Sequence, residues 1–250
     1  AIDRLEVRGR DSAGIAIQVD LPSGALDGLP RALSDRLAAR SADPHAGHGS
    51  VYVTPRGGAD ATVTFSYKTA NLVGRLGDNG ATLRQGIRDD GLLWALAASA
   101  RRASILSHTR WASHGVISVA NCHPHNPSLT GDEAGDAGAA LGAMYALNGD
   151  VDNHAELMTE LVTNRQSAVD AAITTDAKVI PLADRLGDAV GKDRLEQFRG
   201  AIRRLDGSVA IGCIDPAMPG EALLAQKGSG QGLYAARLAD GLVIPPEFPS

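Results

Sequence analysis

Short apolar segments near the end of the chain constrain its fold more than any other feature. Strands are expected there at residues 208–214, 222–226, 233–236 and 242–244. The connections between these segments are too short to hold crossover helices, so consecutive strands must pair antiparallel. The glycine-rich run GSGQG at residues 228–232 is therefore expected to be a turn between strands, not a phosphate-binding loop, because no helix follows it.

Upstream of these strands, the pattern alternates between short strands and amphipathic helices. Further strands are expected at residues 13–19, 51–53, 61–67, 104–106 and 143–147. Helices are expected at residues 30–40, at 71–100 with a break at 77–80, and at 153–164, 176–190 and 193–205. Pro30 favours a helix start, and Asn153 with Glu156 three residues later resembles a capping box. The sequence therefore predicts one mixed domain in which helices cover the sheets.

Composition bounds the classes of function. The 250 residues are 44% hydrophobic, which is enough for one large domain with a buried core. A formal net charge of −5 gives no support for binding nucleic acid or an anionic membrane, and no apolar run approaches the ~20 residues of a membrane helix. The two cysteines, Cys122 and Cys213, are too few for a disulfide framework and fit a cytoplasmic protein. The chain begins at Ala1 and ends in a proline-rich stretch, residues 244–250, so we expect a domain cut from a longer protein.

The strongest candidate for a binding site is the segment HTRWASHG at residues 108–115, which is expected to form a turn-rich region after an apolar strand. Arg110 offers a planar guanidinium that can hold a carboxylate through two parallel hydrogen bonds. A lone arginine is more often part of a structural ion pair. Here Trp111, Ser113 and His114 stand beside it, and this density of polar and aromatic groups favours ligand binding.

Two further positions could add donors or charge to such a site. Asn148-Gly149 follows a strand and offers a side-chain amide and an unobstructed backbone N–H, the donor types of an oxyanion hole. The alternative is a type I′ turn, although a helix and not a returning strand is expected next. Asp176 could bind an ammonium group. It could equally be an acid at the start of a helix, and the two roles can coexist.

Three other groups of polar residues are expected to have structural and not catalytic roles. Asp150 and Asp152 resemble a catalytic pair but are expected at the N-terminus of a helix. Residues 121–140 are rich in Pro, Gly, Asp and Ala and are expected to form a long, mobile surface loop. Within it, NCHPHN (residues 121–126) contains potential zinc ligands without a second pair at zinc-site spacing, so we expect a loop that lines a pocket. No metal site and no cofactor is predicted.

Six short blocks are spread in order along most of the chain: RLEVRGRDSAGIAI (residues 4–17), HTRWASHG, NCHPHN, LNGDVDNHAEL (147–157), TTDAKV (174–179) and LDGSVAIGCID (205–215). Their order resembles that in class II glutamine amidotransferases, most of all in the glutaminase domain of glucosamine-6-phosphate synthases. The resemblance implies an α+β fold, the four-layer αββα sandwich of N-terminal-nucleophile hydrolases, whose two sheets are mainly antiparallel.

The resemblance also implies roles in binding and hydrolysing glutamine. The residues are Arg110, Ser113 and His114 for the α-carboxylate, Asp176 for the α-ammonium, Asn148 and Gly149 for the oxyanion, and Trp111 for the wall where ammonia leaves. The family's chemistry is attack on the side-chain amide by an N-terminal cysteine whose own α-amino group is the base. It passes through a γ-glutamyl thioester, which water hydrolyses to glutamate.

The chain departs from the family pattern at several points. The nucleophilic cysteine and its strand should lie upstream, and neither Cys122 nor Cys213 can replace it. Leu147 stands where histidine is common, Ser113 replaces a common threonine, and the segment 20–107 is longer than in the simplest members. The expected downstream partner is a sugar-phosphate isomerase domain or subunit.

Three functions fit this set of residues. The first is the glutaminase half of an enzyme that transfers ammonia to a sugar phosphate, converting fructose 6-phosphate to glucosamine 6-phosphate. The second is the glutaminase domain of an amidophosphoribosyltransferase-like enzyme. The third is a catalytically inactive domain that binds glutamine or a protein partner, which Leu147 favours. We prefer the first, and the oligomeric state stays open, a homo-oligomer included.

Overall fold

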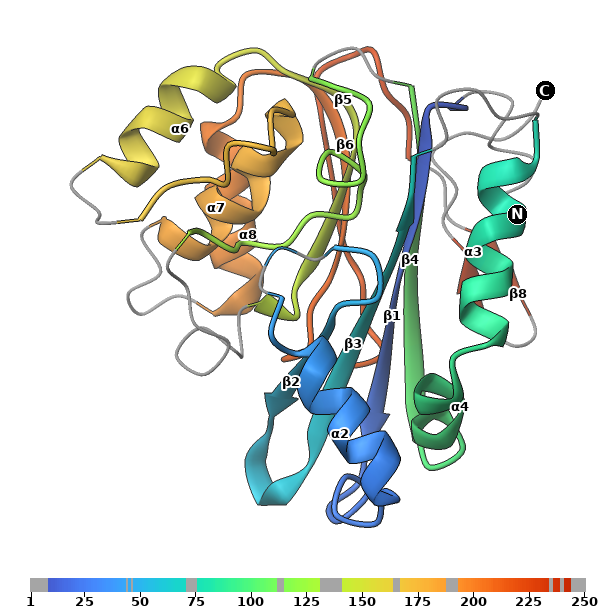
Figure 1. Cartoon of the computed structure of the whole chain (residues 1–250). Helices are drawn as coiled ribbons and strands as arrows, with labels where there is room; N and C mark the ends of the chain where they lie inside the picture. The colour runs from blue at the N-terminus through green and yellow to red at the C-terminus, as the bar shows by residue number, and fades with distance from the viewer. Residues whose placement is uncertain are drawn as a thin grey trace.

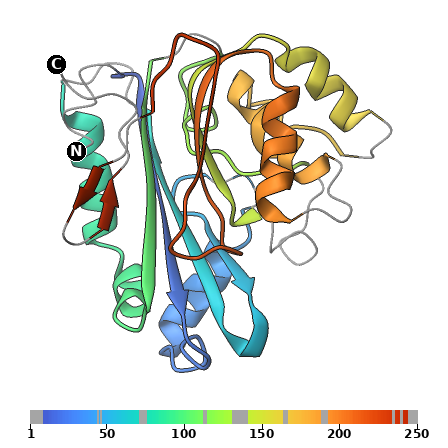
Figure 2. The same cartoon turned by 180° about the vertical axis from the view of Figure 1, so that it is seen from behind.

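The architecture consists of two antiparallel sheets that face each other, with helices over the outer face of each (Figures 1 and 2). These four layers form an αββα sandwich, which confirms the expected fold class. The computed structural model describes residues 9–43, 45, 47–70, 76–111, 115–130, 141–163, 167–187, 193–233, 236–238 and 241–243.

The first sheet has the strand order β2-β3-β1-β4 and is antiparallel throughout. Its elements are β1 (Ser12–Leu21), β2 (Val51–Pro55), the 3-10 turn η1 (Gly57–Ala59), β3 (Ala61–Thr69) and β4 (Arg102–Arg110). The helices over its outer face are α2 (Arg31–Arg40), α3 (Asp78–Arg88) and α4 (Gly91–Ala97). Phe65 on β3 packs with Leu83 and Leu92 of the helices, and this cluster is the core of the first half.

The second sheet has the order β5-β6-β7 and is also antiparallel, as the short connections require. Its elements are β5 (Met144–Val151), β6 (Gly207–Ile214) and β7 (Leu223–Lys227), covered by α6 (His154–Val162), η2 (Asp176–Lys178), α7 (Val179–Leu186) and α8 (Arg194–Arg204). Leu147, Leu182 and Phe198 belong to the core between this sheet and its helices. A separate hairpin follows, formed by β8 (Ala236–Leu238) and β9 (Gly241–Val243), so the strand expected at 233–236 begins later. Among the described helices, none has the length and apolar character needed to cross a membrane.

The inner faces of the two sheets meet in a layer that we call the seam. A small apolar cluster lies there, formed by Ala16, Tyr52, Leu141, Met144 and Ile214. Gln18 Nε2 and Thr64 Oγ1 both donate to Gly142 O, at 3.0 and 3.1 Å. Thr62 Oγ1 donates to Pro216 O at 3.1 Å. Hydrogen bonds as well as apolar contacts therefore join the two halves.

The helical stretch expected at residues 71–100 has two interruptions among its described residues. Gly77, the first residue of the expected break, is a non-helical N-cap with a φ of 102°, whereas residues 78–80 already form the first turn of α3, so the break is shorter than expected. The second interruption lies at Asp90, whose carboxylate accepts from Leu92 N (3.1 Å) and Leu93 N (3.3 Å). A side-chain cap therefore starts α4.

The start of α6 also differs from expectation. Asn153 is the N-cap but forms no capping box. Its Nδ2 donates to Arg204 O (2.9 Å), and its Oδ1 accepts from Asp206 N (2.9 Å). Asp150 belongs to β5 and Asp152 precedes the cap, so the prediction of a helix N-terminal acid is wrong for Asp150.

The segment after residue 120 is not the mobile surface loop that composition indicated. Residues 121–129 are all buried, and Asn121 is 0% exposed. His125 pairs with Tyr145 through two backbone hydrogen bonds of 2.8 Å. Residues 131–140 lie outside the described residues. The described part of this segment is thus a strip laid along one edge of β5.

Candidate functional site

Arg110 is the last residue of β4, so the first three residues of HTRWASHG extend a strand and do not form the expected turn. Its side chain is only 5% exposed. Burial lowers the pKa of the guanidinium, while the charges of Cys122, Asp176 and Asp11 oppose that shift. Leu106, four residues earlier, packs against the seam cluster, so strand alternation places Arg110 on the seam face.

Strand alternation places Asn148 in the same layer. Met144 belongs to the seam cluster, whereas Leu147 and Val151 pack toward the helices on the opposite face of β5. Asn148 is four residues after Met144 and therefore faces the seam. Because β4 packs against β5, Arg110 and Asn148 come from two facing strands.

Asn148 and Gly149 lie inside β5, paired with Ala210 and Val209 of β6, so the type I′ turn is wrong. Gly149 has a φ of +120°, and a Cβ there would lie 1.9 Å from Ser208 O. Only glycine fits such a position. The glycine therefore lets the backbone of β6 approach β5 closely at this point.

One edge of β5 pairs with β6, and the N–H groups along its other edge point outward at every second residue. Three of them have partners: Tyr145 N donates to His125 O (2.8 Å), Leu147 N to His123 Nδ1 (3.2 Å) and Val151 N to Asp176 Oδ2 (2.9 Å). Gly149 N–H points the same way, and no described residue accepts from it. An open backbone donor therefore lies next to the Asn148 side chain.

Asp176 is buried at the start of η2 and is bonded to the edge of β5. Its Oδ2 accepts from Val151 N (2.9 Å), and its Oδ1 accepts from Thr175 Oγ1 (3.3 Å). Thr175 is the N-cap of η2, so Asp176 occupies the first turn, as one of the two interpretations expected. The carboxylate thus combines a structural bond with a charge close enough to act on Arg110.

Asn121 positions the segment before Asp176, and sequence reasoning missed it. Its Oδ1 accepts from Thr174 N (2.7 Å) and Thr175 N (3.1 Å). Its Nδ2 donates to Val116 O (3.0 Å) and to Thr174 Oγ1 (3.1 Å). The only signal in the sequence is an amide residue before Cys-His-Pro-His, and that pattern does not reveal partners 53 residues away.

Three imidazoles pack together beside β5, two of them buried (His123 and His125) and one half-buried (His108). The rings of His108 and His123 stack with centroids 4.4 Å apart, and His123 meets His125 edge to face at 4.9 Å. Burial lowers the pKa of His108 to about 4 and holds the pKa values of His123 and His125 well below the usual range. All three rings are therefore neutral near pH 7. A neutral His123 can accept the Leu147 N–H at Nδ1.

The remaining candidates differ in how the structure places them. Trp111 directly follows β4 and is 73% exposed. Ser113 and His114 lie outside the described residues. Cys122 and Cys213 are both free and buried, and burial raises the pKa of each thiol, so neither is a ready thiolate.

The NCHPHN block does not gather metal ligands. Across the described parts of the chain, no group of three or more His, Cys, Asp and Glu side chains could hold a metal ion. The Cys122 thiol donates to His123 O (3.3 Å), and the rings of His123 and His125 are packed against each other. The block is used for packing and for hydrogen bonding to β5.

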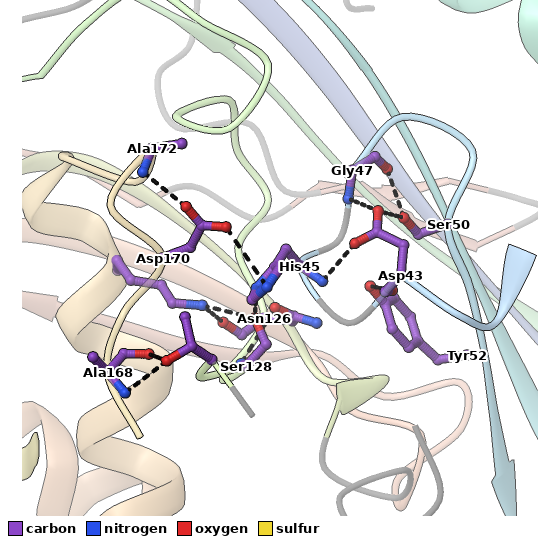
Figure 3. Close-up of polar contacts among 12 residues, drawn as sticks. Asp43, His45, Gly47, Ser50, Tyr52, Asn126, Ser128, Ala168, Asp170 and Ala172 are labelled. Carbon is purple, nitrogen blue, oxygen red and sulfur yellow. Dashed lines mark hydrogen bonds and ion pairs between the residues drawn. The ribbon is translucent and has the colours of Figure 1, made fainter. Parts of the chain in front are cut away.

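A second polar cluster connects the loop after α2 to residues 126–128 and to the segment before η2 (Figure 3). His45 contacts Ser128 Oγ through Nδ1 (3.2 Å) and Asp170 Oδ2 through Nε2 (3.7 Å). Lys178 Nζ donates to Asn126 O (2.7 Å) and to Ser128 Oγ (3.1 Å). The loop itself is held by the Asp43 carboxylate, which accepts from His45 N (2.9 Å), Gly47 N (3.1 Å) and Ser50 Oγ (2.6 Å). The loop is thereby tied to the strip along β5 and to the segment that leads into η2.

Comparison with known proteins relates the chain to enzymes named glutamine–fructose-6-phosphate aminotransferase [isomerizing]. It is 32% identical to the one from Chlamydia pneumoniae over 127 residues, which are 51% of this chain and 19% of that protein. It is 34% identical to the one from Clostridium tetani over 125 residues (50% and 18%). The one from Thermosynechococcus vestitus matches over 183 residues at 29% identity (66% and 27%). Over half of its length or more, the chain is thus similar to class II glutamine amidotransferases.

The chain spans less than a third of the length of the curated relatives that it matches. No protein-family model matches it. Among solved structures, the glutamine phosphoribosylpyrophosphate amidotransferase from B. subtilis with ADP and GMP aligns at a TM-score of 0.47 and 14% identity, over 92% of this chain and 41% of that one. A structure of the allosteric regulatory enzyme of purine biosynthesis gives 0.48 and 15% over the same shares.

Proposed function

We propose that this amidotransferase domain is the glutaminase half of a larger enzyme and hydrolyses glutamine to glutamate and ammonia. The observation that carries the proposal is the open Gly149 N–H beside the Asn148 amide, in the same region as Arg110 and Asp176. Glutamine needs this combination: a cation for its α-carboxylate, an anion for its α-ammonium, and donors for its amide oxygen.

In this proposal, Arg110 binds the α-carboxylate, with Ser113 and His114 completing that end of the pocket. Asp176 binds the α-ammonium. The electrostatic influence of Asp176 on Arg110 supports the pairing, because the two charged ends of an α-amino acid are themselves close together. Trp111 is assigned to the wall beside which ammonia leaves.

The proposed chemistry is attack by a cysteine thiolate on the carbon of the side-chain amide. The C–S bond forms, and the amide oxygen takes up negative charge that Asn148 Nδ2 and Gly149 N stabilise. The cysteine's α-amino group removes the thiol proton and returns it to the departing ammonia. Water then hydrolyses the γ-glutamyl thioester to glutamate and restores the thiol. The nucleophile is assigned to a segment upstream of residue 1.

Leu147 does not argue against this activity. Its side chain packs in the core between β5 and the helices, on the face opposite to Asn148. Only its N–H is directed to the edge where the proposed oxyanion donors lie. The change from the histidine common in the family therefore alters packing behind β5 and leaves the seam face of the strand as it is.

We further propose that residues 1–250 are one domain of a longer cytoplasmic protein whose downstream part receives the ammonia. The names of the curated relatives support a sugar-phosphate acceptor, with fructose 6-phosphate converted to glucosamine 6-phosphate. The two free cysteines support a reducing compartment.

The experiment that tests the function is glutamate release from glutamine by the full-length protein, with a variant whose upstream cysteine is alanine as control. We expect the unaltered protein to release glutamate and the alanine variant to release none. Added fructose 6-phosphate should increase glutamate release by the unaltered protein. Stimulation by phosphoribosyl diphosphate instead would contradict the proposed acceptor. Glutamine binding without release would mean that the domain only binds.

A further inference from the structure

We propose that His123 is a positioning residue for the oxyanion hole: its ring holds the free edge of β5 so that Gly149 N–H and the Asn148 amide stay in place. This inference rests on the proposed glutaminase function. Its starting point is the bond from Leu147 N to His123 Nδ1 (3.2 Å), two residues before Gly149.

The imidazole of His123 lies along the free edge of β5 in the gap between two other partners of that edge, one at Tyr145 and one at Val151. Before the gap, the backbone of His125 pairs with Tyr145 as a neighbouring strand would. After it, Asp176 accepts from Val151 N. Without the imidazole, no described residue would accept a hydrogen bond from this edge between Tyr145 and Val151, and both residues of the proposed oxyanion hole lie in that stretch.

The ring is itself held in place. It stacks on His108, two residues before Arg110 on β4, and it meets His125 edge to face. The backbone behind it lies directly on β1, because a Cβ at Gly14 would be 2.0 Å from His123 O. His123 therefore links the strand that carries the proposed carboxylate clamp to the strand that carries the oxyanion donors.

The bond requires an unprotonated Nδ1, and the surroundings supply that state. Burial is the main cause that keeps the pKa of His123 well below its usual range, and His108, His125, Arg110 and Lys68 act in the same direction. The proton of the neutral ring is then on Nε2. A side chain that offers an uncharged acceptor at the position of Nδ1 should do the same work, and asparagine does so through Oδ1.

The test compares His123→Phe and His123→Asn in the full-length enzyme, with kcat and KM measured for glutamine hydrolysis. We expect His123→Phe to lower kcat about 10- to 100-fold, because the donors shift from the oxyanion position. KM should stay within about threefold, since Arg110 and Asp176 are untouched. His123→Asn should keep kcat within about fivefold of the unaltered enzyme.

A matched control is His48→Phe. His48 Nδ1 accepts from Lys68 N at 3.2 Å, on the part of β3 that β2 does not pair with, so this variant removes the same kind of bond from the first sheet. It should leave kcat unchanged. An unchanged kcat in His123→Phe, or a kcat in His123→Asn as low as in His123→Phe, would overturn the inference, because the acceptor would then not matter.

Amide hydrogen exchange on the unaltered enzyme keeps the inference testable if His123→Phe does not fold. The Leu147 amide should exchange slowly and the Gly149 amide fast. Equal protection of the two amides would overturn the inference, since the gap would then be filled by something other than His123. A protein without glutaminase activity would contradict the proposed function, while the exchange rates would still decide whether His123 holds this edge.

Discussion

Val151 N donates to Asp176 Oδ2 at 2.9 Å, so the acid that we assign to the α-ammonium of glutamine is also bonded to the edge of β5. The two roles can be separated by substitution. Asp176→Asn keeps an acceptor oxygen for Val151 N and loses the charge. We expect KM for glutamine to rise roughly tenfold or more, from the loss of a charge-assisted bond, with the unfolding temperature nearly unchanged. Asp176→Ala should raise KM as well and should also lower the unfolding temperature, because Val151 N then loses its acceptor. If KM is the same in Asp176→Asn, Asp176 is structural only.

Arg110→Ala should weaken glutamine binding. Loss of a charge-assisted pair costs about 1.5–3 kcal/mol, which corresponds to a KM roughly 10- to 100-fold higher. Arg110→Lys should recover only part of this, because an ammonium cannot make two parallel bonds to a carboxylate. Steady-state kinetics with glutamine measure both variants, and Arg88→Ala, on the exposed side of α3, is the control. A KM that does not move would remove Arg110 from the pocket.

Asn148→Ala should act on kcat. Loss of one oxyanion donor typically lowers kcat about 100-fold or more and leaves substrate binding intact. The substitution removes the amide from the seam face while the β5–β6 pairing through Ala210 stays. Single-turnover measurements would show slow thioester formation. If kcat is normal, Gly149 N–H would be the sole donor from this strand, or the oxyanion would form elsewhere.

Lys68 is 2% exposed, and no described residue accepts a hydrogen bond from its Nζ. Burial lowers its pKa to about 8, although Cys122 and Asp43 oppose the shift. The unfolded chain therefore binds more protons between pH 8 and about 10.5, and stability rises with pH across that window. Below pH 8, the buried charge costs on the order of 3 kcal/mol.

Lys68→Met removes this cost. At pH 7 its free energy of unfolding, measured in urea, should exceed that of the unaltered protein by a few kcal/mol at most. The difference should shrink as the pH rises from 8 toward 10. A variant that is less stable at pH 7 would show that the ammonium has a partner that compensates its burial.

The three neutral imidazoles predict acid sensitivity. Their folded pKa values lie below the ordinary value of about 6.5, so the unfolded chain takes up protons first as the pH falls. The contribution of the three rings to stability should therefore be fully present above pH 6.5 and fall from there toward pH 4, by up to roughly 1.4 kcal/mol per pH unit for each ring. His125→Phe should reduce the number of protons taken up on unfolding by about one and so make stability fall less steeply with pH, because His125 Nε2 has no partner among the described residues. An identical slope would mean that His125 is protonated in the folded state.

The sequence predicts most of the strands and helices because their periodic patterns are local. The type I′ turn at Asn148-Gly149 is wrong because the apolar pattern ends there while the backbone pairing with Ala210 and Val209 continues. The surface loop expected at residues 121–129 is wrong for a related reason: their polar composition resembles that of a loop, but their partners lie on β5 and in the segment before η2. Contacts of this range leave no trace in a local pattern.

For the candidate site, chemistry predicts which residue types to consider but not how they meet. Arg110, Asn148 and Asp176 were found by their functional groups and by family resemblance. Asn121 and His123 act through hydrogen bonds to the backbone of distant segments, so only the folded structure identifies them. Ser113 and His114 stay predictions.

The weak packing of the seam affects how the protein loses activity on heating. Each half has its own larger apolar core, whereas the layer between the sheets holds a small cluster and a few polar bonds. Arg110 and Asn148 face that layer, from opposite sides. A small separation of the two sheets would therefore abolish the proposed glutaminase activity while both halves keep their helices and strands. Inactivation by heat would come before melting, and cooling would restore a catalyst that had never lost its secondary structure.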